Sequence, residues 1–172
     1  PVIGFQTKNT NTLRLWSAKA PEEFDMNLFS RGEYVKAMEN KAIAETISKV
    51  LYPADDHYEG KSLRLKQQYF FVSASIQSII KKHLKTNPDL SNLGDKISIH
   101  INDTHPALCI PELMRILLDD YGYSWDDAWA IIGKTVSYTN HTVMSEALER
   151  WPLNLFSSLL PRITRIVNEI NQ

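Results

Sequence analysis

The second half of the chain alternates between short apolar strands and helical patterns, and this order limits the folds open to it. Ile97, Ile99 and Ile101 form a β-branched run with a period of two, and a second strand pattern lies at residues 135–139. Helical patterns separate the two runs and follow the second one. Because this order is typical of parallel strands covered by helices, we expect an α/β fold with both strands in one sheet.

Caps and prolines bound the helices of this half. Pro111 precedes the apolar pattern of residues 113–118, and we expect it in the first helical turn because an interior proline costs about 3 kcal/mol. Ser124 is a suitable N-cap for the next helix, which we expect to run through Ile132. The chain then ends in helical patterns at residues 146–151 and 153–170, interrupted at Pro152 and Pro161.

The first half is expected to hold one strand, two helices and a loop. Leu13, Leu15 and Ala18 fall in a roughly alternating run, which predicts a strand over residues 13–18. From Lys61, apolar residues recur at three and four positions, which predicts a long helix. The other expected features are an amphipathic helix between Gly32 and Leu51 that ends by Pro53, a loop from Tyr52 to Gly60, and a helix break at Asn87 and Pro88.

Length and charge exclude several classes of function. A chain of 172 residues is long enough for one compact domain with one core. Its 19 basic and 20 acidic residues give a net charge of -1, so no long-range field favours nucleic acid or an anionic membrane. No apolar run approaches the roughly 20 residues that a membrane span requires.

The single cysteine and the chain ends indicate the setting of the protein. Cys109 excludes an internal disulfide, which fits a reducing cytoplasm. It lies in an apolar stretch without a nearby base, so we expect no catalytic thiol. The sequence opens at Pro1 without a signal or transit peptide and stops at Gln172 within a helical pattern, and we expect an internal piece of a longer protein.

The two predicted strands end in similar polar segments, at residues 102–105 and 140–142, each containing Asn, Thr and His. If the strands are parallel, both carboxyl ends open at one edge of the sheet, where α/β folds bind ligands. Asp103, His105 and His141 would then converge. A carboxylate and two imidazoles can donate and accept hydrogen bonds to several hydroxyl groups, and sugars present such hydroxyls.

Other roles remain open for these residues. His100, Asp103 and His105 could suggest a metal site, but histidines five apart across a strand end would not easily share a face, and we expect no metal. Asp103 or Thr104 could cap the following helix, a role compatible with ligand contact. Two glycosylation sequons, at the two strand ends, are chance matches in a chain without secretory features.

Aromatic and basic side chains elsewhere have competing interpretations. The loop at residues 52–58 mixes acidic and aromatic residues, which can stack on a sugar face and hydrogen-bond its edge. Lys81 and Lys82 could meet a phosphate, although two charges on a helix are usually a solvated face. Three tryptophans in helical patterns are expected to be core residues rather than sugar platforms: Trp125, Trp129 and Trp151.

Several longer motifs occur together, in order, from the start of the chain to its end. They are LRLWSA at residues 13–18, VLYP at 50–53, EGKSLRLKQQYF at 59–70, NDTHP at 102–106, IPEL at 110–113, YTNHT at 138–142 and EALERW at 146–151. Together they resemble the glycogen and maltodextrin phosphorylases almost end to end. Several long motifs in the right order are far more specific than any single pattern above.

The resemblance implies a fold, an activity and a cofactor. The fold is a partial Rossmann-like layer of a larger GT-B-like enzyme, with residues 1–172 a single internal segment of its N-terminal domain, forming a wall of the catalytic cleft. The family uses orthophosphate to cleave the terminal α-1,4 linkage of a glucan and release glucose 1-phosphate, with pyridoxal phosphate held as a Schiff base. The cofactor lysine and the phosphate-binding basic residues belong to a later part of the family sequence, so we expect the isolated chain to be inactive.

The resemblance also implies roles for individual residues. His141 matches the family histidine that contacts the glucose at the cleaved bond, so its implied role is substrate orientation and hydrogen bonding in the transition state. Asp103 and His105 match residues that line the same pocket. No cofactor-binding residue is expected in this chain.

The loop and the helix before it also resemble functional elements of the family. Asp55 and Asp56 lie in what resembles the mobile loop that gates the active site, and Tyr52 matches a glucan-contacting aromatic at its base. The helix at residues 34–46 resembles the element that crosses the dimer interface, which implies a homodimer.

Two departures and two alternatives accompany the resemblance. Lys81 and Lys82 stand where the nucleotide-regulated animal enzymes have paired arginines, and lysine lacks the bidentate fork of a guanidinium, so we do not expect regulation by AMP. The loop at residues 86–95 is shorter than in those enzymes, which favours a bacterial member. The alternatives are a non-catalytic glucan-binding or assembly module derived from a phosphorylase and, less favoured by the motifs, a glycosyltransferase that uses a nucleotide sugar.

Overall fold

The computed structural model describes residues 2–21 and 24–172, and the chain divides into two compact units, residues 1–53 and residues 54–172. The single core expected from the chain length is confirmed within the described residues. The buried core cluster, which runs from Val72 to Ile166, lies wholly within the second unit. Among the described hydrophobic residues of the first unit, only Ala37 is buried, so this unit does not share that core.

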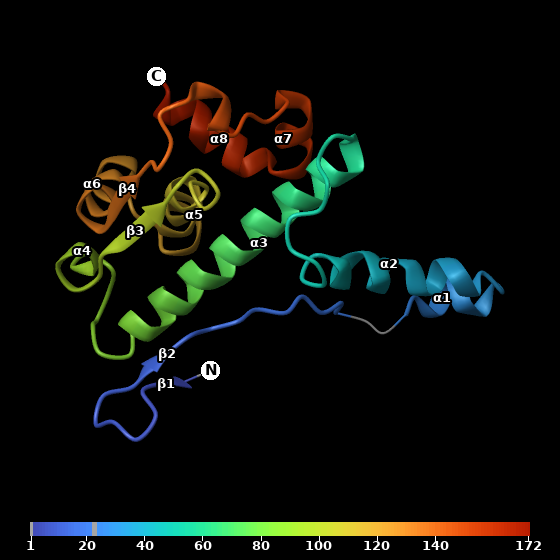
Figure 1. The fold of residues 1–172 in the computed structure, drawn as a ribbon, viewed down its shortest axis with the longest axis horizontal. Helices are drawn as coiled ribbons and strands as arrows, with labels where there is room; N and C mark the ends of the chain where they lie inside the picture. The colour runs from blue at the N-terminus through green and yellow to red at the C-terminus, as the bar shows by residue number, and fades with distance from the viewer. Residues whose placement is uncertain (1, 22–23) are drawn as a thin grey trace. The chain divides into compact units, whose positions relative to one another are not determined.

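The first unit contains a short hairpin and two helices (Figure 1). In the hairpin, β1 (Val2–Ile3) pairs antiparallel with β2 (Asn11–Thr12). The helices are α1 (Met26–Ser30) and α2 (Tyr34–Thr46), which contact each other. Asp25 caps α1 by accepting hydrogen bonds from the backbone N–H groups of its first turn.

The strand expected over residues 13–18 is wrong. Residues 13–20 have no regular structure, and Leu13 and Leu15 are exposed. Within the described residues, no strand pairs with this segment. An alternating pattern indicates which side chains could share a face, but a strand also needs a neighbour to satisfy its backbone groups.

The helix expected between Gly32 and Leu51 is confirmed as α2, but it ends at Thr46 rather than near Pro53. The N–H groups of the next three residues donate to carbonyls three positions back, at 3.4, 3.2 and 3.2 Å, and this tightens the chain out of the α-helix. Most of the apolar side chains on α2 are exposed, including Tyr34, Val35, Met38 and Ile43.

A long helix, α3 (Tyr58–His83), opens the second unit and confirms the helix expected from Lys61. It starts earlier than expected because the Nδ1 atom of His57 accepts a hydrogen bond from the backbone N–H of Gly60 at 2.8 Å and caps the first turn. Its buried face includes Leu65, Val72, Ile76 and Ile80.

The two-stranded sheet of this unit confirms the predicted parallel pair (Figure 1). β3 (Ile99–Asn102) and β4 (Val136–Thr139) run in register, with Asn102 beside Thr139. Ile101 enters the core, whereas His100 and Asn102 on the other face of β3 are exposed. The fold of the second unit is thus mixed α/β.

Helices pack around one central helix, α5 (Cys109–Arg115), which contacts α3, α6 and α8. Pro111 lies in its first turn, as expected, and the chain continues into the π-helical turn η1 (Ile116–Asp120). The other helices of this part are α4 (Leu93–Lys96), α6 (Trp125–Thr135), α7 (Leu153–Leu159) and α8 (Pro161–Ile170). Ser124 caps α6 as predicted, and Pro161 separates the last two helices.

Two sequence expectations for this part fail. The helix predicted at residues 146–151 is only a short 3₁₀ turn, η2 (Ser145–Ala147), and Pro152 disfavours helical backbone in the residue before it. Trp129 is 44% exposed and is not a core residue, because its position on α6 faces away from the buried stripe. Trp125 packs against the core as expected, and Trp151 is half-buried.

Candidate functional site

The carboxyl ends of β3 and β4 bring the two similar polar segments together. The backbone N–H of Asp103 donates to the carbonyl of Thr139 at 2.8 Å, which extends the strand pairing one residue beyond β3. The Nε2 atom of His141 is hydrogen-bonded to Oδ1 of Asn102. A neutral ring that donates from Nε2 to this amide oxygen has Nδ1 as its acceptor. Asp103 and His141 therefore follow directly from the paired strand ends.

The turn after β3 has an unusual backbone. Asp103 has φ 69°, in the left-handed region, which aspartate tolerates better than most residues. Its carboxylate accepts a hydrogen bond from the N–H of Thr104 at 2.7 Å. The hydroxyl oxygen of Thr104 is buried and has no hydrogen-bond partner among the described residues.

The alternative that Asp103 or Thr104 caps the following helix is wrong. The N-cap position of α5 is Leu108, and no side chain caps it. The carboxylate of Asp103 is occupied within its own turn, before α5 begins. His105 lies further along this turn and is half-buried.

His100 joins the two strands on their exposed face. Its Nε2 atom lies 2.6 Å from the hydroxyl of Thr139, and its Nδ1 atom lies 3.1 Å from the hydroxyl of Ser137. These contacts occupy both ring nitrogens with partners on β4. No group of three or more His, Cys, Asp or Glu residues within residues 2–21 and 24–172 is placed to hold a metal ion.

The loop before α3 is anchored on the first turn of that helix. Asp55, Asp56 and His57 are exposed, and His57 caps α3 through Gly60. A Cβ atom at Gly60 would lie 1.8 Å from the carbonyl oxygen of Ala54, so the loop backbone approaches the helix too closely for any side chain there. Within the second unit, the loop at residues 54–57 therefore packs closely against the first turn of α3.

Tyr52 belongs to the first unit, whereas the other candidate residues belong to the second. It has φ 54° and is 46% exposed. A non-glycine residue in the left-handed region costs of order 1–3 kcal/mol and is found more often at functional positions than elsewhere.

Sequence reasoning missed one polar cluster in the second unit. Arg64 on α3 donates from Nε and Nη2 to one carboxylate oxygen of Glu149, at 3.0 and 2.7 Å. Gln68, one turn further along α3, donates to both oxygens of Glu149 at 2.8 and 3.1 Å. Arg64 also lies 3.8 Å from the carboxylate of Asp55. Arg64 and Gln68 lie in the motif at residues 59–70, and Glu149 lies in the motif at residues 146–151. No local spacing relates Arg64 to Glu149.

Cys109 and the basic pair on α3 do not add chemistry to the site. Burial raises the pKa of the Cys109 thiol to about 11, so it is not a nucleophilic thiolate at neutral pH. Lys81 and Lys82 are exposed in the last turn of α3, where positive charge interacts favourably with the helix dipole.

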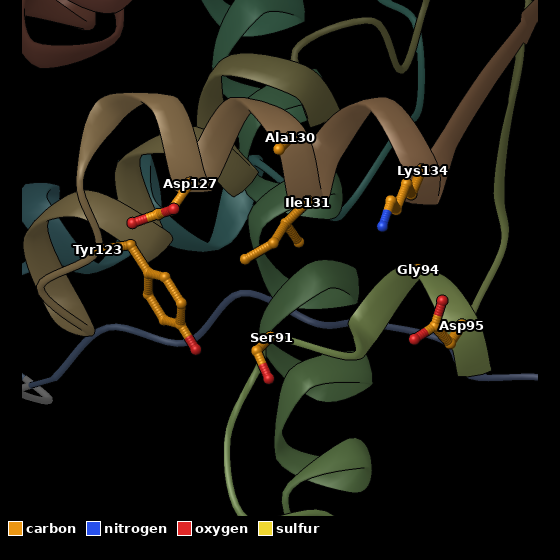
Figure 2. Close-up of a pocket in the computed structure, with 8 residues that line it drawn as sticks. All are labelled: Ser91, Gly94, Asp95, Tyr123, Asp127, Ala130, Ile131 and Lys134. Atoms are coloured by element: carbon orange, nitrogen blue, oxygen red, sulfur yellow. The ribbon is translucent and has the colours of Figure 1, made fainter.

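A cavity of about 390 Å³ lies between α4 and α6 (Figure 2). Lys134 from α6 points toward it, and Asp95, Tyr123 and Asp127 line it as well. α4 directly precedes β3, and α6 directly precedes β4. The cavity between the two helices therefore lies near the amino ends of the strands, opposite the carboxyl ends that lead to Asp103 and His141. Its lining residues include no histidine, so it does not extend the candidate site.

The cofactor implied by the resemblance requires an amine to form a Schiff base. The strand-end segments, residues 102–105 and 139–142, offer a carboxylate, amides, hydroxyls and imidazoles, but no lysine. These residues can contact a hydroxylated ligand but cannot hold pyridoxal phosphate covalently. Separately, no helix in the described part of the chain is long and apolar enough to cross a membrane.

Comparison with known proteins gives a consistent result. A family model described as carbohydrate phosphorylase matches residues 1–172. Glycogen phosphorylase of Haemophilus influenzae is 51% identical over 170 residues, which cover 99% of this chain and 21% of that protein. Brain-form glycogen phosphorylase of Homo sapiens is 50% identical over 180 residues, covering 100% of this chain and 21% of that protein. The chain spans about a fifth of the length of the curated relatives it matches, and it belongs to the carbohydrate phosphorylase family.

Proposed function

We propose that this chain is part of an α-1,4-glucan phosphorylase, which uses orthophosphate to release glucose 1-phosphate from glycogen or a maltodextrin. The observation that supports this most directly is the parallel pairing of β3 and β4, because it brings Asp103 and His141 to one edge within a chain of this family. The isolated chain is expected to be inactive, since it spans about a fifth of its relatives' length.

His141 is proposed to orient the sugar at the cleaved bond. Its Nε2 proton is directed to Asn102, which fixes the ring and leaves Nδ1 free to accept a hydrogen bond from a sugar hydroxyl. If the contact strengthens in the transition state, it lowers the barrier and not only the KM. Asp103 and His105 are proposed to bind further hydroxyls of the same sugar.

Asp55 and Asp56 are proposed to belong to a loop that gates the site, with Tyr52 as a glucan contact at its base. Exposed acidic side chains at the mouth of a phosphate-using site disfavour anions until the loop moves. The close packing of residues 54–57 on the start of α3 supports a loop with one preferred position.

Pyridoxal phosphate is proposed as the cofactor of the complete enzyme, where its phosphate group would assist proton transfer. Residues 1–172 are proposed to supply contacts to the sugar but none to the cofactor. The parent is proposed to have a GT-B-like fold, with this chain in its N-terminal domain as part of a Rossmann-like layer.

A homodimer and a cytoplasmic location are proposed for the parent. The exposed apolar side chains of α2, with Val35 at 85% exposure, support a protein partner for this helix. A chain with Cys109 as its one cysteine supports a reducing compartment. Paired lysines at positions 81 and 82 argue against an AMP-binding arginine pair.

The proposal is tested in a full-length phosphorylase that contains residues 1–172. With maltodextrin and orthophosphate, the wild-type protein should form glucose 1-phosphate; a protein that binds glucan without forming it would favour the non-catalytic alternative. His141→Ala should lower kcat by about 10²–10³, as for other lost transition-state hydrogen bonds, while cofactor absorbance is unchanged. Normal turnover would remove His141 from the site.

A second experiment tests the loop. Replacing Asp55 and Asp56 together by alanine should change the KM for orthophosphate or glucan more than kcat, because the loop controls access. Wild-type kinetics in this double variant would count against gating.

A further inference from the structure

Arg64, Gln68 and Glu149 form a cluster that joins the start of α3 to the segment after His141. Arg64 and Gln68 are four residues apart on a helix and so share a face. Glu149 lies in residues 148–152, which have no regular structure and follow η2. The position of this irregular segment therefore depends on side-chain contacts rather than on a helix or sheet.

The contact between Arg64 and Glu149 is strong by its geometry and burial. Two guanidinium nitrogens donate to the carboxylate at 3.0 and 2.7 Å, and Gln68 adds two more hydrogen bonds. The side chains of Arg64 and Glu149 are only 18% and 17% exposed, and Gln68 is buried. Hydrogen bonds to charged groups, partly removed from water, are among the strongest in proteins.

The contact between Arg64 and Asp55 is much weaker than the contact with Glu149. Asp55 Oδ2 lies 3.8 Å from Nε of Arg64, beyond hydrogen-bond distance, and the Asp55 side chain is 51% exposed. Exposed ion pairs of this kind contribute little and are screened by salt. Arg64 thus contacts the loop at residues 54–57 and the segment at residues 141–151 with unequal strength.

We propose that Arg64 is a positioning residue that couples the loop at residues 54–57 to the segment at residues 141–151, in the sense that both depend on this one side chain while neither depends on the other. Its firm contact with Glu149 holds the segment that contains His141, and its labile contact with Asp55 holds the loop. When Asp55 moves away, Arg64 keeps Glu149 and Gln68 nearby, so loop opening does not leave a half-buried guanidinium without a carboxylate. This role rests on the proposed function, in which the loop gates the site and His141 orients the sugar.

Hydrogen exchange measured by mass spectrometry on the full-length protein tests the coupling without requiring turnover. Asp55→Asn should raise exchange in residues 54–57 by no more than about fivefold and leave residues 141–151 unchanged. Glu149→Gln should raise exchange in residues 141–151 by roughly tenfold or more, without loosening the loop. Arg64→Gln should raise exchange in both segments, and Arg64→Lys should restore part of the protection.

Arg162→Gln is the matched control. Arg162 on α8 donates from the same two guanidinium nitrogens to Asp119, one to each carboxylate oxygen, at 2.8 and 2.6 Å, elsewhere in the same unit. This variant should leave both segments at wild-type exchange. If Arg64→Gln gives the same pattern as Arg162→Gln, the coupling is refuted.

The wild-type protein provides a test that does not depend on the folding of any variant. Raising the NaCl concentration should increase exchange in residues 54–57, because the exposed Asp55 contact is screened, and should leave exchange in residues 141–151 unchanged. Equal responses of the two segments would overturn the proposal. A protein that forms no glucose 1-phosphate but has this exchange pattern would refute the proposed function and not the coupling.

Discussion

Replacing Glu112 by glutamine is expected to loosen the packing of α5 on α3. The Glu112 side chain is fully buried and accepts four hydrogen bonds. One oxygen accepts from Ser73 at 2.7 Å and from Nη2 of Arg115 at 3.0 Å, and the other accepts from Tyr69 at 2.8 Å and from Nε of Arg115 at 2.9 Å. Burial, followed by the hydrogen bond to Glu112, raises the pKa of Tyr69 to about 12, so its hydroxyl remains a donor at neutral pH.

The magnitude follows from the geometry around the two oxygens. Each oxygen faces one N–H group of Arg115, so either orientation of a glutamine amide sets its NH₂ group against a guanidinium donor. The substitution therefore removes charge-assisted hydrogen bonds and leaves Arg115 with Asp120, at 3.2 Å, as its carboxylate partner among the described residues. Breaking a buried ion pair from one side costs about 3–5 kcal/mol. We expect about 3 kcal/mol, or roughly a 150-fold change in an opening equilibrium.

The assay is hydrogen exchange of the amides in α3 and α5 of the full-length protein, which reports local opening. Glu112→Gln should speed exchange in these helices by about 100-fold, and Tyr69→Phe, which removes one donor to a charged group, should have a smaller effect. Asp119→Asn is the matched carboxylate-to-amide control, because Asp119 is 34% exposed, and such pairs are worth at most about 1 kcal/mol. Equal exchange in Glu112→Gln and Asp119→Asn would refute the reasoning.

Three further predictions concern a glycine, an ion pair and the cysteine. Gly60→Ala should destabilise the start of α3, because the new Cβ would meet the carbonyl of Ala54. In the control Gly133→Ala, in α6, the new Cβ meets nothing within 4 Å, and this variant should be stabilised by about 0.5–1 kcal/mol. Thermal unfolding measures both changes in stability. Hydrogen bonds from Arg162 lower the pKa of Asp119 below 3.8, so the ion pair stabilises the fold above pH 3.8 and this contribution is lost as the pH falls through the lower folded pKa. Hydrogen exchange in α8 should rise in that acidic range, and Asp119→Asn should remove this pH-dependent rise. Cys109, whose pKa burial raises to about 11, should resist thiol alkylation at pH 8 in the native protein and react after denaturation, as measured by peptide mass spectrometry; rapid native labelling would contradict its burial.

Local patterns in the sequence predicted the elements whose causes are local. The period of α3, the Ser124 cap and the Pro111 position all depend on residues within a few positions of one another. The pairing of β3 with β4 was predictable because parallel neighbours are the usual outcome of this element order. The strand expected at residues 13–18 is not formed, because the alternating pattern of these residues does not specify a neighbouring strand for them to pair with.

The candidate site was predictable only in part, for the same reason. The edge that Asp103 and His141 follow comes from strand order, but the left-handed turn at Asp103 comes from a backbone conformation that its residue type permits without requiring. The pairing of Arg64 with Glu149 joins residues 85 positions apart, and neither motif specifies the other as its partner. Long-range polar contacts of this kind need the folded chain to be seen.

The distribution of burial explains why polar contacts matter at this edge. Asp55, Asp56 and His141 are exposed, and Asp103 and His105 are half-buried, whereas the core cluster from Val72 to Ile166 is buried. Exposed side chains gain little order from packing, so their positions must come from directed hydrogen bonds. Asn102 supplies one for His141, and Arg64 supplies those that hold the segment after it. Substitutions at Asn102 or Arg64 should therefore alter the site while leaving the core intact. Substitution at Glu112 should instead loosen the packing of α5 on α3 while leaving the site intact.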